Sequence, residues 1–292
     1  MRNKNIPVYH LTDFKQFESG RDFYANTLQD HLQTHHFIHA PHRHDFFITI
    51  LFAKGSGTHE IDFKFYDVKP GTIFFLSPGQ MHDWKLSDNC EGYIFFHSAA
   101  FYNLYFMSKK IKDYPFFASL YNQPYLYLKP SEKTALAQKF NTLLHEYKGN
   151  GLMKNALLCN MADSIYIELT RLYPSLSTKE NVSAGYLSKL ATFEQLTNTE
   201  FRTLKLPKDY AGRLHLSEKH LNRICQECLG KTTSEVITDK IIMEAKRLLI
   251  TSGLPVSQIA EELGYSDHAY FSRFFRKKCG QTPLKFVKGY KG

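Results

Sequence analysis

The stretch "GYSDHAYFSRFFRKKCGQTP", residues 264–283, decides the fold of the C-terminal third, because it sets four basic residues among five aromatic ones. In a helix, Phe271, Phe274 and Phe275 stand at i, i+3 and i+4 and therefore share one face. The other face carries small, polar and basic residues: His268, Ala269, Ser272, Arg273 and Arg276. One side is thus expected in a core, and the other suits guanine edges or phosphates in a major groove of DNA.

The same pattern occurs twice. Ala211 and Leu214 recur as Ala260 and Leu263 at an offset of 49 residues. Further on, five positions recur at an offset of 50, where Leu221, Asn222, Arg223, Gly230 and Thr232 match Phe271, Ser272, Arg273, Gly280 and Thr282. Two copies are too few for a solenoid, so the pattern predicts one domain with two helix-turn-helix units.

The second helix of the first copy shows the same division of faces. Leu221 and either Ile224 or Cys225 are expected to point inward, and the outward positions near the helix start are Lys219, Asn222 and Arg223. Arg can pair with guanine through two hydrogen bonds, and Asn can do the same with adenine. Residues 234–250 favour a helix of roughly 25 Å. Such a helix would hold the two DNA-contacting helices near successive major grooves.

Charge separates this region from the rest of the chain. Residues 183–292 carry 18 Lys and Arg against 11 Asp and Glu, whereas residues 1–182 carry 19 against 17. A basic C-terminal domain indicates a nucleic-acid or acidic-membrane contact, with a solvated surface as the plain alternative. A chain of 292 residues favours two domains. Five cysteines, no signal-peptide pattern and no long apolar run predict a soluble, cytoplasmic protein with no membrane contact.

The region from about 46 to 97 has a β pattern. Four apolar runs, "FFITILFA", "THEIDFKFY", "TIFFLS" and "GYIFFH", are separated by turn signals at 54–57, 67–71 and 77–80. In the second run, Ile61, Phe63 and Phe65 alternate with polar residues. This spacing predicts a small antiparallel barrel or sandwich.

Two helices are expected after Pro130. One face of the first carries Leu136, Phe140, Leu143, Leu144 and Tyr147, and one face of the second carries Met153, Leu157, Met161, Ile165, Leu169 and Leu172. These faces either form a dimer seam or pack on the β domain of the same chain. The polar, turn-rich segment 173–185 follows them and is typical of an interdomain linker.

The string "IAEELGYSDHAYFSRFFRKKCGQTPLKFV" resembles the signature of the AraC/XylS family of bacterial transcription regulators. The resemblance covers roughly residues 186–290. It implies two helix-turn-helix units on one linker helix, with base contacts from the early residues of both recognition helices. In this sequence these residues are Lys219, Asn222 and Arg223, then His268, Ala269, Ser272 and Arg273. Relatives can carry a longer polar side chain at Ala269, which leaves this residue a thymine methyl contact at best.

The stretches "APHRHDFF" and "KPGTIFFLSPGQMHDW" resemble the cupin-like sensor domains that precede such DNA-binding domains. His42, His44 and His82 could supply three nitrogen ligands to a metal, but the Glu that metal-binding cupins use is missing. No metal or other cofactor is therefore expected. Together with Trp84, these histidines are instead candidates for an effector pocket, and a core position is the alternative for Trp84.

Two further patterns have plain explanations. "CQEC", Cys225 to Cys228, has redox spacing but lies inside a predicted recognition helix, which favours buried small residues. The stretch "HLQTHHFIHAPHRH" has six histidines without a regular ligand spacing, and its expected consequence is pH sensitivity.

The sequence therefore predicts an α+β protein with two domains. The expected parts are a cupin-like antiparallel β-barrel that binds an effector (1–130), a helical connector that can dimerise (131–175), a linker (176–185) and an all-α DNA-binding domain (186–292). Such a regulator is expected to bind double-stranded promoter DNA, act with RNA polymerase and respond to a small molecule, and to have no enzymatic activity. The alternatives are a metal-dependent cupin enzyme with an accessory DNA-binding domain and an architectural DNA-binding protein that senses nothing.

Overall fold

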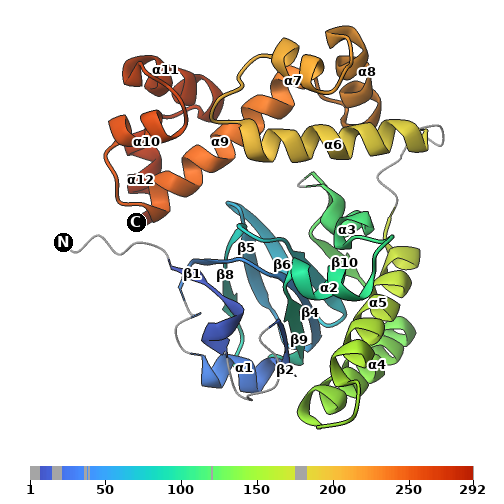
Figure 1. Ribbon diagram of the computed structural model, residues 1–292. Helices are drawn as coiled ribbons and strands as arrows, with labels where there is room; N and C mark the ends of the chain where they lie inside the picture. The colour runs from blue at the N-terminus through green and yellow to red at the C-terminus, as the bar shows by residue number, and fades with distance from the viewer. Residues whose placement is uncertain are drawn as a thin grey trace. The chain divides into compact units, whose positions relative to one another are not determined.

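The computed structural model describes residues 7–14, 22–35, 38, 40–119, 121–174 and 183–291. The chain divides into two compact units, one within Pro7–Leu176 and the other within Ser177–Gly292. Figure 1 shows the first as strands with flanking helices and the second as helices only. The predicted α+β class is confirmed. Of the predicted linker 176–185, residues 176–182 lie outside the described ranges, and Ser183 already caps a helix.

The strands of the N-terminal unit are β1 Val8–Tyr9, β2 Phe23–Thr27, β3 His42–His44, β4 Phe47–Lys54, β5 Gly57–Ile61, β6 Lys64–Val68, β7 Thr72–Leu76, β8 Met81–Leu86, β9 Glu91–His97 and β10 Tyr125–Tyr127. They form two five-stranded sheets, in the orders β1-β3-β8-β5-β6 and β10-β7-β4-β9-β2. The helices of this unit are η1 Leu11–Phe14, α1 Leu28–Thr34, α2 Ala99–Tyr105, η3 Ile111–Asp113, α3 Pro115–Ala118, α4 Pro130–Lys148 and α5 Lys154–Leu172.

Of the predicted barrel or sandwich, the structure shows the sandwich, and the antiparallel barrel is corrected in two respects. The described strands form two open sheets, with edge strands β1 and β6 in one and β10 and β2 in the other, and no pair of described strands joins the two sheets. The β1–β3 pair is also parallel. Sequence analysis began the β region at about residue 46 and so did not include β1 or β3.

The second sheet buries both of its faces. On β4, Ile48, Ile50 and Phe52 point into the space between the two sheets, while Phe47 and Leu51 point to the helical side. Helices α4 and α5 cover that side (Figure 1). All five residues of the face predicted for α4 are buried, and this face packs on the sheet of the same chain.

Two local predictions for this unit are wrong. Residues 58–66 form a hairpin instead of one strand, because Asp62 and Phe63 adopt positive φ (48° and 67°), so Phe65 is 70% exposed. The buried face of α5 is also rotated from the predicted one. Met153 and Leu157 are exposed, and the face is made by Leu158, Cys159, Ala162, Asp163, Ile165, Tyr166 and Leu169.

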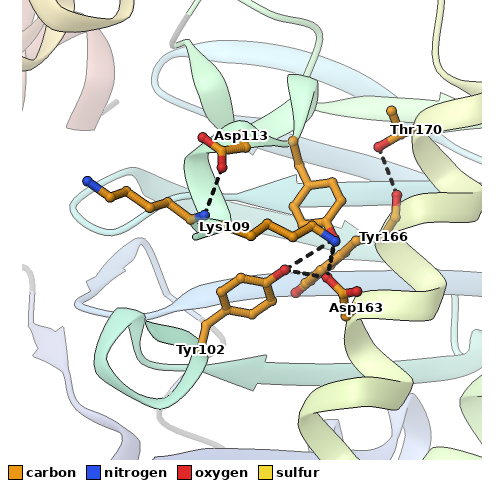
Figure 2. A network of polar contacts seen from close by, with 8 residues as sticks. Tyr102, Lys109, Asp113, Asp163, Tyr166 and Thr170 are labelled. Carbon is orange, nitrogen blue, oxygen red and sulfur yellow. Dashed lines mark hydrogen bonds and ion pairs between the residues drawn. The ribbon is translucent and has the colours of Figure 1, made fainter. Parts of the chain in front are cut away.

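A polar cluster ties the segment that follows β9, including α2, to helix α5. The Asp163 carboxylate on α5 accepts hydrogen bonds from Tyr102 on α2 and from Tyr114, and Lys109 Nζ lies 2.6 Å from its Oδ1 atom (Figure 2). Burial alone would raise the pKa of Asp163, but Lys109 and the two hydroxyls outweigh it and lower the pKa. The cluster therefore holds an ionised carboxylate on the buried face of α5.

The C-terminal unit consists of α6 Ala184–Glu200, α7 Pro207–Arg213, α8 Glu218–Leu229, α9 Thr233–Thr251, α10 Val256–Glu262, α11 His268–Cys279 and α12 Pro283–Lys291. The pairs α7–α8 and α10–α11 are the two predicted helix-turn-helix units, and α9 connects them. In Figure 1, α8 and α11 lie toward opposite ends of this unit. Among the helices of the described ranges, none is long and apolar enough to span a membrane.

Candidate effector and DNA-binding sites

Strand pairing brings the predicted pocket residues together between the sheets. His42 on β3 lies opposite His82 on β8, and their ring centroids are 4.2 Å apart. His44 lies 5.2 Å from the His82 ring and Trp84 lies 5.4 Å from it, centroid to centroid. All four side chains are buried, with Trp84 the most exposed at 8%.

A fifth member of this group, His59 on β5, was missed by sequence analysis. Its Nε2 atom lies 3.0 Å from His82 Nδ1, and its ring lies 5.5 Å from that of Trp84. The signal was present, because His59 stands two residues before the inward-facing Ile61 and alternation places both on one side of the strand. We call His42, His44, His59, His82 and Trp84 the interior cluster.

The histidines of the interior cluster are uncharged at neutral pH. Burial lowers the pKa of His42 to about 4 and those of His44 and His59 to about 3. Burial and the neighbouring rings also place the pKa of His82 well below its ordinary value. The cluster therefore offers hydrogen bonds without a positive charge.

The hydrogen bonds of the cluster leave several ring nitrogens without a partner. His42 Nδ1 lies 2.9 Å from Ala40 O, and His44 Nδ1 lies 2.7 Å from Phe46 O. The atoms His44 Nε2, His59 Nδ1, His82 Nε2 and Trp84 Nε1 are buried and have no hydrogen-bond partner. Such atoms each cost about 1–3 kcal/mol and need an explanation in a native fold.

The protonation of these rings follows from their neighbours. A carbonyl only accepts, so His44 carries its proton on Nδ1 and its Nε2 is an acceptor. Trp84 Nε1 is a donor. Between His59 and His82 one ring donates to the other, so whichever does so, one free nitrogen of the pair is a donor and the other an acceptor. The cluster thus presents two free donors and two free acceptors.

The helix-turn-helix units have the predicted inner faces. Ser217 caps the start of α8 and Asp267 caps that of α11, while Gly230 and Gly280 end these helices at positive φ. Five residues predicted to point inward are fully buried, namely Leu221, Ile224, Cys225, Phe271 and Phe275, each with 0% exposure. Phe274, which was predicted to lie on the same inner face, is only half-buried.

The candidate DNA-contacting residues are mostly on the outer faces. Lys219, Arg223, His268, Ala269, Arg273 and Arg276 are exposed, and Ser272 is half-buried. The Arg223 guanidinium lies over the Tyr186 ring at 5.9 Å, and the Arg273 side chain is 70% exposed, 3.8 Å from Asp267. Asn222 differs, because its Oδ1 accepts a hydrogen bond from Thr233 N at 3.1 Å and is thereby directed toward α9.

The remaining sequence patterns have structural roles. Burial raises the pKa of the Cys225 thiol to about 11, the reverse of an activated cysteine. Of the six clustered histidines, His36 and His39 lie outside the described residues. Across the described ranges, no three His, Cys, Asp or Glu side chains are grouped so that they could hold a metal ion.

Comparison with known proteins assigns both units. Residues 27–160 match the AraC-like ligand binding domain, and residues 210–289 match a helix-turn-helix domain. The chain belongs to the AraC family of transcriptional regulators. It is a regulator with a DNA-binding and a ligand-binding domain, and this assignment is favoured over a cupin enzyme.

Named relatives span most of the chain. The HTH-type transcriptional regulator YfiF of Bacillus subtilis is 26% identical over 88% of this chain and 82% of its own length. The arabinose operon regulatory protein of Salmonella typhimurium is 22% identical, with coverages of 83% and 84%. Among solved structures, ToxT of Vibrio cholerae matches 91% of this chain and 98% of its own, with 14% identity and a TM-score of 0.46.

Proposed function

We propose that this AraC-family regulator binds an uncharged, hydroxyl-rich small molecule at the interior cluster and changes its affinity for promoter DNA in response. The observation that carries the proposal is the set of four buried ring nitrogens without partners. Two of them donate and two accept, and a hydroxyl group does both. Since the histidines are neutral, no cation is present in the cluster to favour an anionic ligand.

Effector binding is coupled to conformation. The side chains of the cluster are at most 8% exposed, so a ligand reaches them only when the sandwich opens locally. A ligand that binds the open state more tightly than the closed state shifts the population between them. Strand β4 borders both the interior space and the helical layer, so such a shift reaches α4 and α5.

The DNA contacts are proposed for the exposed residues of α8 and α11. Lys219, Arg223, Arg273 and Arg276 supply cationic groups, and His268, Ala269 and Ser272 line the same outer face of α11. Asn222 can offer its amide nitrogen, while its oxygen holds the start of α9. The regulator is proposed to act in the cytoplasm on promoter DNA with RNA polymerase, and exposed residues of the α4–α5 region are available for a homodimer.

A thermal-shift screen of the full chain tests the effector proposal. The panel contains pentoses, hexoses and polyols, with short carboxylic acids as the charged contrast. A neutral polyol should raise the unfolding temperature of the parent, and Trp84→Phe together with His59→Phe should abolish the increase. Stabilisation by carboxylic acids alone, or an increase that survives both substitutions, would contradict the proposal.

A further inference from the structure

A partly buried lysine donates hydrogen bonds to the carbonyls at two helix ends that lie far apart in the sequence. Lys205 Nζ donates to Phe201 O at 2.5 Å and to Arg202 O at 3.0 Å, both just after the end of α6. It also donates to Leu263 O at 2.5 Å, at the end of α10. The last carbonyls of a helix have no intrahelical partner and carry partial negative charge, so one ammonium satisfies both ends.

The backbones approach each other closely at this point. A Cβ atom on Gly264 would lie 1.8 Å from Arg202 O, which no side chain tolerates. The equivalent position in the first repeat is His215, which adopts a similar positive φ of 53° with an ordinary side chain. The turn conformation alone therefore does not require glycine. The segment after α6, which leads into the first helix-turn-helix unit, is docked into the turn of the second unit.

The docked segment also reaches the recognition helix of the second unit. Lys205 Nζ lies 4.9 Å from the centroid of the Tyr265 ring. That ring in turn packs against Phe271 and Phe274 of α11, with centroids 5.5 and 5.7 Å apart. The contact thus runs from the end of α6 to the inner face of α11. Burial and the nearby Arg202 charge lower the pKa of Lys205 to about 8, consistent with a partly buried ammonium.

This lysine lies outside the repeated pattern. At the offset of 49 residues, Leu254 stands in its place in the second copy. The contact is therefore asymmetric and joins the two helix-turn-helix units directly, in addition to the covalent connection through α9. An ammonium with three carbonyl partners restricts rotation of one unit against the other around α9.

We propose that Lys205 is a positioning residue that sets α11 relative to α8, so that the regulator selects operators by the spacing between their two contacted segments. The inference rests on the proposal that α8 and α11 read DNA. Lys205 is not among the residues proposed to contact bases. Loss of the Lys205 side chain should leave α8 and α11 intact and change only how firmly their relative position is held.

The test uses the full chain and a duplex obtained by in vitro selection with the parent protein. Affinities are measured for this duplex and for versions with one or two base pairs inserted between the two protected segments. The parent should bind the two-base-pair insertion at least about tenfold more weakly, since one helix loses its base contacts. We call the affinity for the selected duplex divided by the affinity for the two-base-pair insertion the spacing ratio. Lys205→Met should reduce the spacing ratio to less than about threefold. Lys205→Arg should restore it, because Arg retains a cation with several donors.

The spacing ratio distinguishes the proposed positioning role from a simple loss of charge and from partial unfolding. Lys189→Met, an exposed lysine of α6, removes the same charge and should keep the parent ratio. Partial unfolding of Lys205→Met would lower binding to every duplex by one factor and leave the ratio unchanged. A Lys205→Met ratio equal to that of the parent would overturn the inference, as would a parent that tolerates insertions. Failure of selection to yield any preferred duplex would instead contradict the proposed function.

Discussion

His59 Nε2 and His82 Nδ1 lie 3.0 Å apart on neighbouring strands, and the second nitrogen of each ring is buried without a partner. The pair uses half of its hydrogen-bonding capacity on itself and leaves the other half facing the interior between the sheets. Together with His44 and Trp84 it forms a polar group among the apolar residues between the two sheets. Unsatisfied groups of this kind are expected where a protein has been shaped for a ligand and not for maximal stability.

Trp84→Phe should therefore cost little stability. The substitution loses ring volume but also removes a buried N–H without a partner, so we expect a change below about 1 kcal/mol. Phe74→Leu is the matched control, because Phe74 is fully buried beside the same cluster and has no polar atom to relieve. It should cost roughly 1–3 kcal/mol. Equal losses in urea denaturation would show that the Trp84 nitrogen carries no penalty.

Acid should destabilise the N-terminal unit well above pH 4. In the unfolded chain, histidines protonate near their ordinary pKa of about 6.5. Burial lowers the pKa of His42 and His97 to about 4 and of His44 and His59 to about 3 in the fold. The unfolded state thus binds more protons below pH 6.5, and stability falls by up to about 1.4 kcal/mol per histidine and pH unit.

This loss can be followed in the N-terminal unit alone. Trp84 is the sole tryptophan of the chain, so its fluorescence reports unfolding of that unit. The unfolding temperature should drop clearly between pH 7 and pH 5.5. An unchanged temperature across this interval would mean that the buried histidines accept protons inside the folded unit.

Asp163→Asn should weaken the attachment of α2 and the following segment to α5. The neutral amide keeps the shape of the carboxylate but loses the charge that pairs with Lys109 and orients Tyr102 and Tyr114 (Figure 2). Lys109 is 32% exposed, so water compensates in part and the expected cost is about 1–3 kcal/mol. Lys54→Met, which breaks the exposed pair with Glu91, should cost less than about 1 kcal/mol. A smaller effect for Asp163→Asn than for Lys54→Met would refute the role given to this cluster.

Gly264→Ala and Gly280→Ala form a matched pair. Both glycines have positive φ, 79° and 74°, so both substitutions add a similar backbone strain of about 1–2 kcal/mol. A Cβ on Gly280 meets nothing within 4 Å, whereas on Gly264 it would collide with Arg202 O. Gly264→Ala should therefore be the more destabilising by at least about 1 kcal/mol in far-UV circular dichroism of the unfolding transition. Equal effects would mean that the docked segment moves away freely.

The sequence predicts the DNA-binding unit better than the sensor unit for a physical reason. A helix-turn-helix unit is encoded locally, since its caps, its glycine turns and its i, i+3, i+4 apolar set all lie within about 25 residues. Ser217, Gly264 and the buried Phe271 and Phe275 could each be assigned from neighbours alone. The docking of Lys205 on Leu263 spans 58 residues and leaves no local pattern.

The sandwich depends on contacts that no local window contains. The hairpin at Asp62 and Phe63 lacks the Asn-Gly or Asp-Gly pair that usually indicates such a turn, so one strand was predicted where two exist. His59 joins the interior cluster through strand pairing with β8, and only that register places it beside His82. His42, His44, His82 and Trp84 could be proposed because they resemble a known sensor motif, while the free donors and acceptors required the structure.

The central claim is that α8 and α11 each read a separate segment of one duplex. Base-preference profiles of Arg223→Ala and Arg273→Ala, measured on libraries of the selected duplex, test it most directly, with Lys277→Ala as the charge control. Each arginine variant should lose about 1–3 kcal/mol of discrimination in its own segment, with the two segments about one helical turn apart. The lysine variant should weaken all sequences alike. Profiles of both arginine variants identical to the parent, or altered in the same segment, would contradict the claim.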